Sequence, residues 1–449
     1  FDKDGSASNA PTFMKQLTYV VADNISGSGS KVGGMFGEVT ITNPSNYLAR
    51  VLDFNFGLNQ NTTLYPDCVG VVDVESISGK DNVGGLIGLA DRITVQSVGI
   101  EFESISGTGD NVGGYVGSMS YGYLYYAYAN ILKGVDDAYA PITGGGSKVG
   151  GLIGYAHHAE PGGVYIKNIA VSGNSNVGGF IGYAIGIESG SSVSTLDISY
   201  KTQLVNVTVN GGKNVGGLLG YSQFVDIVRS SSGISYNDAL RLHIDSVVGT
   251  ENVGGLLGYS ENTYISSSSN GIRITVDKLN GNKNVGGYIG YLKTPRNNIL
   301  SMSAFLGSGS YHIKEYTGTR DYTVGNAIGL LDCTGMSDQN IYKLSEAVFE
   351  NNAVMSPYTI GTIYDTIKIG GGDFSKVEMF TTYINQTPLD ISSVNSSYTY
   401  GKLISNGGVY TGKVMHISDK DDGIVKQNKE MMIFCFVFLK QYLKKLKEY

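Results

Sequence analysis

The sequence has little cysteine, little proline and no tryptophan, and these scarcities exclude several classes of protein. The three cysteines, Cys68, Cys333 and Cys435, are far apart and odd in number, so they predict neither a disulfide framework nor a CxxC metal site. No run of 18 apolar residues occurs, and hence no membrane-spanning helix is expected. Before the C-terminus, capping boxes ahead of long runs of helical period are also missing, which argues against a helical fold.

Excess positive charge is likewise missing. The formal net charge is −7, and the charged residues are dispersed along the chain. Such a chain offers no electrostatic footprint for nucleic acid or for an anionic membrane, so we predict no nucleic-acid partner. Glycine is abundant, at 64 of 449 residues, but 41% of the residues are hydrophobic, which is enough for a packed interior.

A repeat organises the chain. A Val-Gly-Gly core recurs with spacings from 28 residues (Val149 to Val177) to 51 residues (Val32 to Val83). A constant core with variable spacers indicates one fixed structural element per unit, with insertions elsewhere. The copies begin at Val32, Val83, Val112, Val149, Val177, Val215, Val253 and Val285, with a degraded copy at Val324.

Short strands surround each core. Runs such as "IKNIAVSG" and "QLVNVTVNG" alternate with period 2 and are rich in Val, Ile and Thr, which is typical of strands. One such unit cannot bury its apolar face alone, whereas stacked units can. We therefore predict an all-β fold, a β-solenoid of the right-handed parallel β-helix type. The expected parts are repeats over 1–330, an irregular continuation over 331–430 and an amphipathic tail over 431–449.

The glycines of the core pose a question, because glycine weakens an ordinary strand. In "GNSNVGGFIGYA" alternation places Phe180 between Gly178 and Gly182 on one face, and Val177, Gly179, Ile181 and Tyr183 on the other. The glycines then either admit another backbone at close range or adopt a positive φ at a corner. The sequence leaves both explanations open.

Stacked units also turn single positions into ladders. The asparagine before the valine tolerates a left-handed turn conformation, and its side chain can hydrogen-bond from coil to coil. A tyrosine after the core predicts a parallel aromatic column. The asparagines are Asn82, Asn111, Asn176, Asn214, Asn252 and Asn284, and the tyrosines are Tyr155, Tyr183, Tyr221, Tyr259 and Tyr291.

The cores "VGGLIG" and "VGGLLG" resemble the GLUG motif of bacterial surface proteins, among them haemagglutinin-like adhesins, autotransporter passengers and the non-catalytic part of some immunoglobulin A peptidases. Gly85 to Gly88 and Gly151 to Gly154 match it directly, whereas Tyr115, Phe180 and Tyr288 replace its leucine. The resemblance covers about residues 25–330. It implies export to the bacterial surface or secretion and a β-solenoid, and it assigns no catalytic residue.

The C-terminal tail differs from the repeats. Nine apolar residues, 431–439, meet a lysine-rich stretch in which apolar residues recur at spacings of 3 and 4, so a short amphipathic helix is expected. It would cap the last coil, anchor the chain to a partner or membrane, or be a tail translated out of frame.

Signatures of catalysis are largely missing. No GxxxxGK[ST] occurs, and strands rather than helices follow the glycines, which excludes a phosphate loop. "HHAE" at 157–160 lacks the HExxH order of a metallopeptidase and is expected in a solvated loop. We predict no cofactor, no metal and no enzymatic activity. The alternative is a carbohydrate-active β-helix enzyme whose acids would gather from successive coils.

One segment predicts a binding surface. In "YGYLYYAYAN" alternation along a strand places Tyr121, Tyr123 and Tyr125 on one face and Tyr126 and Tyr128 on the other. Tyrosine combines flat apolar area with a polar tip, which suits sugar rings or protein partners. The leading hypothesis is an adhesin-like passenger or stalk that contacts a host receptor or glycan. The plainer interpretation of the whole chain is a purely structural stalk. The plainer interpretation of the tyrosine segment is an insertion packed on the solenoid's flank.

Overall fold

The structure is a computed structural model, and it describes 15 segments of the chain. Every regular element within them is a strand. No helix in these segments is long and apolar enough to cross a membrane. The segments are 19–40, 52–55, 70–96, 98–125, 127–129, 138–189, 192–194, 196–198, 202–227, 240–265, 272–293, 310–318, 324–325, 328–332 and 360–364.

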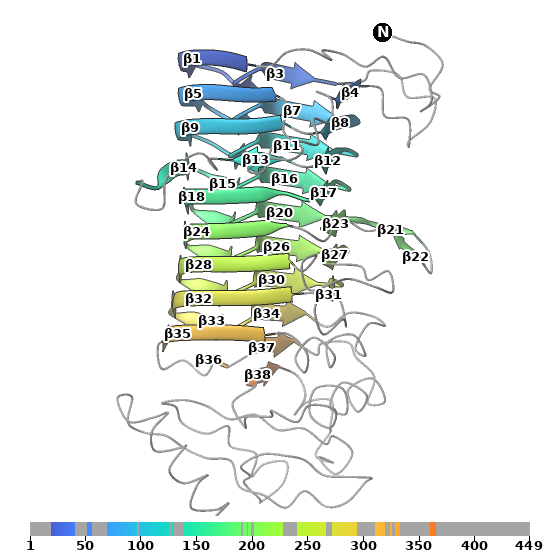
Figure 1. Ribbon diagram of the computed structural model, residues 1–449. Coiled ribbons are helices and arrows are strands. Elements are labelled where there is room, and N and C mark those ends of the chain that lie inside the picture. Colours follow the sequence, from blue (N-terminus) through green and yellow to red (C-terminus); the bar gives the residue numbers. More distant parts are fainter. Residues whose placement is uncertain are drawn as a thin grey trace, which may run out of the picture.

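Three long parallel sheets form the molecule, because each coil of the chain gives a strand to each sheet in turn (Figure 1). Sheet 1 contains β1 (Tyr19–Ser26), β5 (Gly70–Gly79), β9 (Val98–Gly107), β13 (Tyr128–Ala129), β14 (Ala140–Gly144), β18 (Tyr165–Ser172), β24 (Gln203–Asn210), β28 (Leu240–Val248), β32 (Ile272–Gly281) and β35 (Ser310–Gly318). Sheet 2 contains β2 (Val32–Gly33), β6 (Val83–Gly84), β10 (Val112–Gly113), β15 (Ser147–Gly150), β19 (Ser175–Gly178), β25 (Lys213–Gly216), β29 (Glu251–Gly254), β33 (Lys283–Gly286) and β36 (Val324–Gly325). Sheet 3 contains β3 (Phe36–Val39), β7 (Ile87–Asp91), β11 (Val116–Ser120), β16 (Ile153–His157), β20 (Ile181–Ile185), β26 (Leu219–Gln223), β30 (Leu257–Glu261), β34 (Ile289–Lys293), β37 (Ile328–Asp332) and β38 (Ile360–Tyr364).

Smaller sheets lie beyond sheet 3. Sheet 4 contains β4 (Leu52–Asn55), β8 (Ile93–Gln96), β12 (Tyr123–Tyr125) and β17 (Glu160–Gly162), and sheet 5 contains β23 (Leu196–Ile198), β27 (Val225–Ile227) and β31 (Tyr264–Ile265). Both are parallel, whereas β21 (Ile187–Ser189) and β22 (Ser192–Ser194) form an antiparallel pair. In Figure 1 sheets 4 and 5 follow one another down the same side of the molecule.

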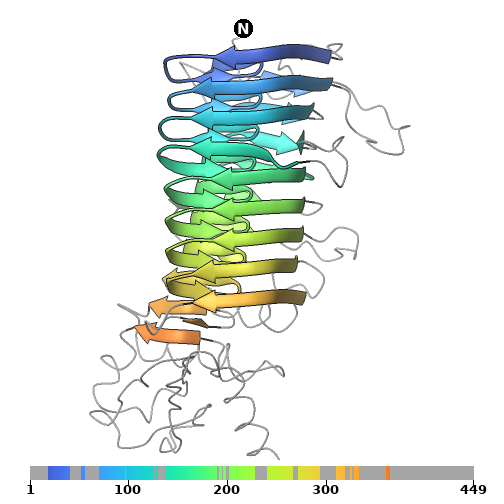
Figure 2. The same ribbon diagram turned by 90° about the vertical axis from the view of Figure 1, so that its left-hand side faces the viewer.

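The coils are stacked in register and wind to the right. The valine of the repeated core pairs with the valine of the coils on either side, as Val177 does with Val149 and Val215. In Figure 2 the N-terminal coil is at the top, the strands of sheet 1 run from right to left, and the chain returns behind them. This is a right-handed parallel β-helix, so the predicted fold class is confirmed. The helix expected over 431–449 lies outside the described residues.

The core lies between sheet 1 and the bend that joins sheets 2 and 3. Ile166 and Ile169 of sheet 1 and Val177 of sheet 2 are all fully buried. Phe180 lies in the bend itself, and both it and Ile181 after it are buried, whereas Tyr183 is half-buried. The predicted strict alternation through "NVGGFIGYA" is therefore wrong, because the bend after Gly178 interrupts the strand.

The glycines serve close backbone packing. A Cβ added to Gly178 would lie 2.8 Å from the amide nitrogen of Gly220 in sheet 3, one coil further on. A Cβ on Gly182 would lie 2.5 Å from the amide nitrogen of Val149 in sheet 2, one coil back. Sheets 2 and 3 thus meet backbone to backbone. The alternative of a positive φ is wrong for these glycines, since Gly163 is the only glycine of the described segments with one.

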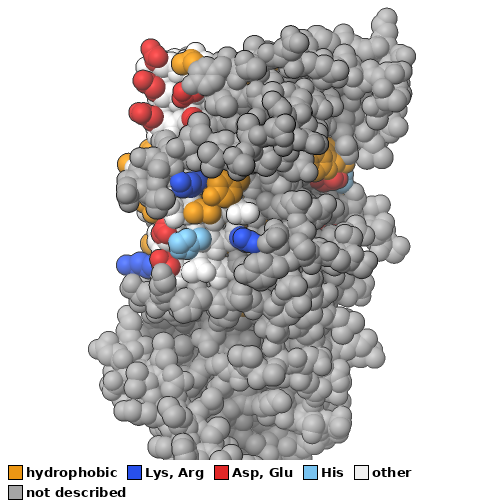
Figure 3. All heavy atoms as spheres, viewed as in Figure 1, with side chains coloured by type: hydrophobic (Ala, Val, Ile, Leu, Met, Phe, Trp, Pro, Cys, Tyr) orange, Lys and Arg blue, Asp and Glu red, His pale blue; other side chains and the backbone are white. Residues whose placement is uncertain are grey.

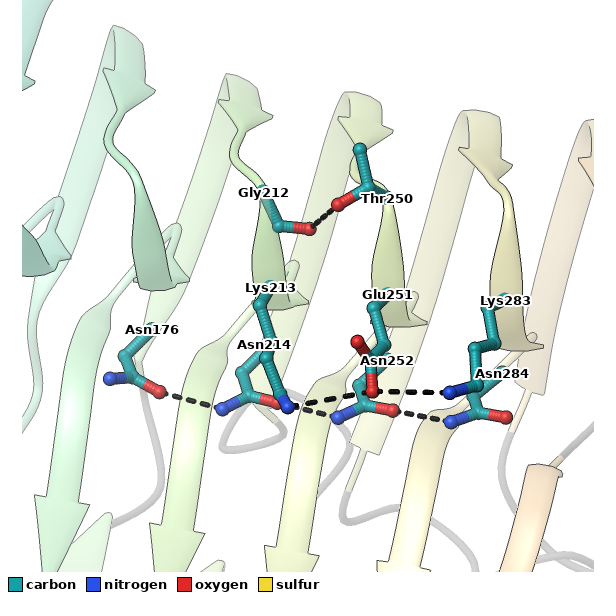
Figure 4. Close-up of polar contacts among 9 residues, drawn as sticks. All are labelled: Asn176, Gly212, Lys213, Asn214, Thr250, Glu251, Asn252, Lys283 and Asn284. Carbon is teal, nitrogen blue, oxygen red and sulfur yellow. Dashed lines mark hydrogen bonds and ion pairs between the residues drawn. The ribbon is translucent and has the colours of Figure 1, made fainter.

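The left-handed corner residue is instead the asparagine before the valine. Asn176, Asn214, Asn252 and Asn284 all have φ between 52° and 55°. Their side-chain amides form a ladder in which each Nδ2 donates to the Oδ1 of the preceding coil, over 2.8, 2.7 and 2.6 Å (Figure 4). Outside this ladder Glu251 lies between Lys213 and Lys283, at 3.5 and 3.6 Å. The predicted asparagine and tyrosine ladders are both present.

Replacing Asn252 tests the ladder. Asn252→Gly keeps the left-handed backbone but removes the donor to Asn214 Oδ1 and the acceptor of Asn284 Nδ2, so we expect a loss of about 1–3 kcal/mol in the free energy of unfolding. Asn252→Ala should cost about 1 kcal/mol more, because alanine resists a positive φ. Urea denaturation measures both. The exposed Lys213→Ala is the control and should stay within about 1 kcal/mol of the unaltered chain. Equal stability of Asn252→Ala and the unaltered chain would contradict the ladder's role.

Replacing Gly182 tests the backbone contact. In Gly182→Ala the new methyl group meets main-chain atoms, which cannot rotate away, so we expect a loss of at least about 3 kcal/mol or failure to fold. Gly29→Ala is the matched control, since a Cβ there meets no atom within 4 Å. Thermal unfolding of the two variants compares them. A Gly182→Ala protein as stable as the Gly29→Ala protein would show that sheets 2 and 3 are not in direct contact.

Candidate functional site

The tyrosine column on the outer face of sheet 3 is the first candidate surface. From Tyr155 to Tyr291 the ring centroids are 5.8, 4.3, 4.7 and 5.0 Å apart, and all four pairs are stacked. Burial, followed by the charges of neighbouring tyrosines and acids, raises the pKa of Tyr221 and Tyr259 well above the usual value. Since each inner ring has both faces against its neighbours, the column offers edges and hydroxyls rather than open ring faces. Its main contribution is to coil stacking.

Lys148 ends this column on the N-terminal side. It replaces asparagine at the left-handed corner, with φ 65°, and its Nζ lies 4.9 Å from the Tyr155 ring centroid and 5.4 Å from that of Tyr183. A cation at this distance interacts favourably with the aromatic quadrupole. At its other end each strand of sheet 3 between β7 and β16 leads to a second corner, where the chain passes into sheet 4.

A second row of left-handed residues forms that corner. Arg92, Tyr121 and His158 connect sheet 3 to sheet 4 in three successive coils, with φ between 49° and 55°. The amide of Arg92 donates to the carbonyl of Ser120, and the amide of Tyr121 donates to the carbonyl of His157. Hydrogen bonding between coils thus continues through the corner. It fixes the backbone positions from which these three large side chains extend.

The corner side chains form one cluster. Arg92 contacts Asp91 through Nη1 and Oδ2 at 2.6 Å, and its guanidinium carbon lies 5.1 Å from the centroid of the Tyr121 ring. The ring of Tyr121 is also 5.1 Å from that of His157, edge to face, and 5.5 Å from that of His158. The Tyr121 ring is consequently held among a guanidinium and two imidazoles.

Burial shifts the titration of this cluster. It raises the pKa of the Asp91 carboxyl, and the charges of Arg92 and His157 offset the shift only in part. Burial also lowers the pKa of His157, with the charge of His158 adding to the effect. Neutral His157 can both donate and accept a hydrogen bond.

Sheet 4 presents two further tyrosines beside the corner. In β12 Leu124 is buried, whereas Tyr123 and Tyr125 are half-buried, with ring centroids 5.6 Å apart and tilted by 35°. Tyr123 is in register with Thr94 and Glu160, and Tyr125 with Gln96 and Gly162. We call Arg92, Tyr121, Tyr123, Tyr125 and His157 the corner patch. It combines aromatic rings with planar hydrogen-bonding groups from three coils.

The structure divides the five tyrosines that the sequence predicts as a surface. Tyr123 and Tyr125 share a face of β12, and Tyr121 precedes it at the corner. Tyr126 lies outside the described residues. Tyr128 belongs to β13 in sheet 1, so the prediction of one continuous strand is wrong: β12 and β13 belong to different sheets.

Sequence reasoning did not predict Arg92 and His157 as parts of the corner patch, nor His158 as their neighbour. The histidines were predicted in a solvated loop, but His157 ends β16 and His158 is a corner residue, both half-buried. Their signal was positional. Arg92, Tyr121 and His158 stand at the same offset after the valine of their Val-Gly-Gly cores, and His157 immediately precedes that position; only the left-handed corner gives this offset a meaning.

No protein-family model, curated protein or solved structure matches this chain. Any function therefore has to be inferred from its own residues and their arrangement.

The carboxylates bear on the enzyme alternative. Figure 3 shows acidic side chains gathered on the face of sheet 1 over β1, β5 and β9, where Asp73, Glu75, Glu101 and Glu103 lie along an open sheet. Among the described residues, one group of three potential metal ligands has donor atoms within 4.8 Å of one another, and it contains two carboxylates. The acids over β1, β5 and β9 thus lie along an open sheet face, and the enzyme alternative stays a prediction.

The lowered pKa of His157 predicts a pH effect. The unfolded chain binds a proton at His157 at a higher pH than the folded protein does, so this contribution to stability is complete above about pH 6.5 and is lost as the pH falls through the lowered value. We expect His157→Gln to reduce the loss of unfolding free energy between about pH 7.5 and 5.5. Urea denaturation at each pH measures it. An unchanged difference between the two pH values would contradict this assignment.

Proposed function

We propose that this chain is an adhesin-like protein, secreted or displayed at a bacterial surface, that presents a rigid β-solenoid and binds glycans through the corner patch. The observation that carries the proposal is the corner patch itself. It brings three tyrosine rings, a guanidinium and an imidazole together at the edge of a rigid scaffold, with the Asp91 carboxylate against the guanidinium.

The chemistry of the corner patch suits sugars. A pyranose ring offers C–H groups on its faces and hydroxyls around its rim. Tyr123 and Tyr125 are tilted relative to each other rather than stacked in a column, and both side chains are half-buried, so part of their surface is available to a ligand. Glu160 lies in register with Tyr123, and its carboxylate can accept hydrogen bonds from sugar hydroxyls.

The scaffold supports the same proposal. Coil-to-coil hydrogen bonds continue through strands, bends and corners, so a side chain at the corner is held by its neighbours in two other coils. A preorganised surface binds with a smaller entropic cost than a mobile one. The resemblance of the repeats to the GLUG motif adds the expectation of surface export, since proteins with that motif include adhesins and autotransporter passengers.

Glycan binding is the test. We expect the purified chain to bind members of a glycan array, and the double variant Tyr123→Ala/Tyr125→Ala to lose affinity about tenfold or more, which corresponds to about 1.4 kcal/mol. Tyr221→Phe is the matched control, because its ring stays in the column. Circular dichroism confirms that each variant keeps its strands.

The outcomes separate the candidate functions. Binding that is lost in the double variant and kept in Tyr221→Phe supports the proposal. Binding to whole cells but to no glycan would point to a protein receptor. A chain that binds neither glycans nor cells would overturn the proposal and favour an inert stalk. Equal glycan binding in all variants would overturn the corner patch as the binding site.

A further inference from the structure

A group of three metal-ligating side chains lies on the outer face of sheet 1, away from the corner patch. His243 and Asp245 belong to β28, and Asp277 belongs to β32 in the next coil. One ligand atom of each comes within 4.8 Å of the other two, and His243 Nε2 is 4.0 Å from Asp277 Oδ1. The side chains of His243 and Asp277 are 46% and 33% exposed, so an ion can reach them from solvent.

The register brings two carboxylates together. Ile244 pairs with Val276 and Ser246 with Lys278, which places Asp245 directly beside Asp277. Like charges on directly opposite residues of neighbouring strands destabilise a sheet. The outer face of sheet 2 shows the opposite arrangement, where Glu251 lies between Lys213 and Lys283. A divalent cation between Asp245 and Asp277 would turn their repulsion into attraction.

Tyr139 adds a positioning contact. It lies just before β14, and its hydroxyl donates to Asp245 Oδ2 at 2.5 Å although the two residues are 106 positions apart. Ligating carboxylates in metal sites are commonly oriented by such hydrogen bonds from outside the ligand shell.

From this geometry we propose that His243, Asp245 and Asp277 bind one divalent transition-metal ion of the zinc class, with Tyr139 as a positioning residue. One imidazole and two carboxylates are donors that zinc accepts, at about 2.0–2.2 Å. Tetrahedral donors at that distance lie about 3.4 Å apart, so the three half-exposed side chains need to close by about 1 Å. The ion would join the coil of β28 to the coil of β32 and leave a fourth position for water or a ligand.

Zinc titration of the metal-free full chain tests the site. We expect calorimetry to show one zinc ion per chain, and the affinity to fall at least about tenfold in His243→Ala and in the isosteric Asp277→Asn. Tyr139→Phe should weaken binding by about tenfold, because it removes only the positioning contact. His157→Gln is the matched control at the other histidine cluster and should leave this affinity unchanged.

Two further measurements keep the result decisive. The visible spectrum of the cobalt-substituted chain distinguishes imidazole and carboxylate ligands from the thiolates of Cys68, Cys333 and Cys435. In the unaltered chain, zinc should protect His243 from diethyl pyrocarbonate, as mapped by mass spectrometry. Absence of zinc binding, affinity unchanged in both ligand variants, or undiminished modification of His243 with zinc bound would overturn the proposal.

Discussion

The direct contact between the backbones of sheets 2 and 3 is the constraint on which the rest of the structure depends. A methyl group at Gly182 would lie 2.5 Å from the amide nitrogen of Val149, so every coil needs glycine where the two sheets meet. This contact leaves the interior between the bend and sheet 1, where Phe180 and Ile169 are fully buried. It also forces a sharp bend after Gly178, and the amides of the bend bond to the next coil instead of to each other.

Constant contacts at the bend leave the corners free to vary. The asparagine ladder and the tyrosine column repeat the same residue because each copy must match the copies above and below it. At the corner between sheets 3 and 4 the backbone is equally regular, but its left-handed positions hold residues as different as Arg92, Tyr121 and His158. The hydrogen bonds that join the coils at this corner are made by backbone amides and carbonyls. The side chain at the left-handed position can therefore differ between coils while these hydrogen bonds are kept. A uniform scaffold with variable corners fits the binding function that we propose.

The two proposed sites use the register in different ways. At the corner patch, side chains from three coils surround Tyr121 with Arg92 and His157, so the coils supply complementary groups. On sheet 1 the same register places Asp245 beside Asp277, where complementarity is incomplete without a cation. In-register stacking therefore places the corresponding side chains of successive coils next to one another, whether or not these side chains are complementary. Unlike groups produce the packed cluster around Tyr121, and at Asp245 and Asp277 the proposed cation would offset the repulsion of like charges.

The sequence alone determined the fold class, the ladders and the position of every repeated glycine, because a motif that recurs with variable spacers constrains one element per coil. It predicted that Tyr121, Tyr123 and Tyr125 share one strand face, and the structure keeps Tyr123 and Tyr125 together on β12. Only the tertiary structure decided between close packing and a positive φ for the glycines, since the two explanations demand the same residue. It also separated Tyr128 from β12, placed Arg92 and His157 against Tyr121 and brought Asp245 beside Asp277. Those neighbours lie tens of residues apart along the chain, and their contacts follow from the coil register, which variable spacers conceal in the sequence.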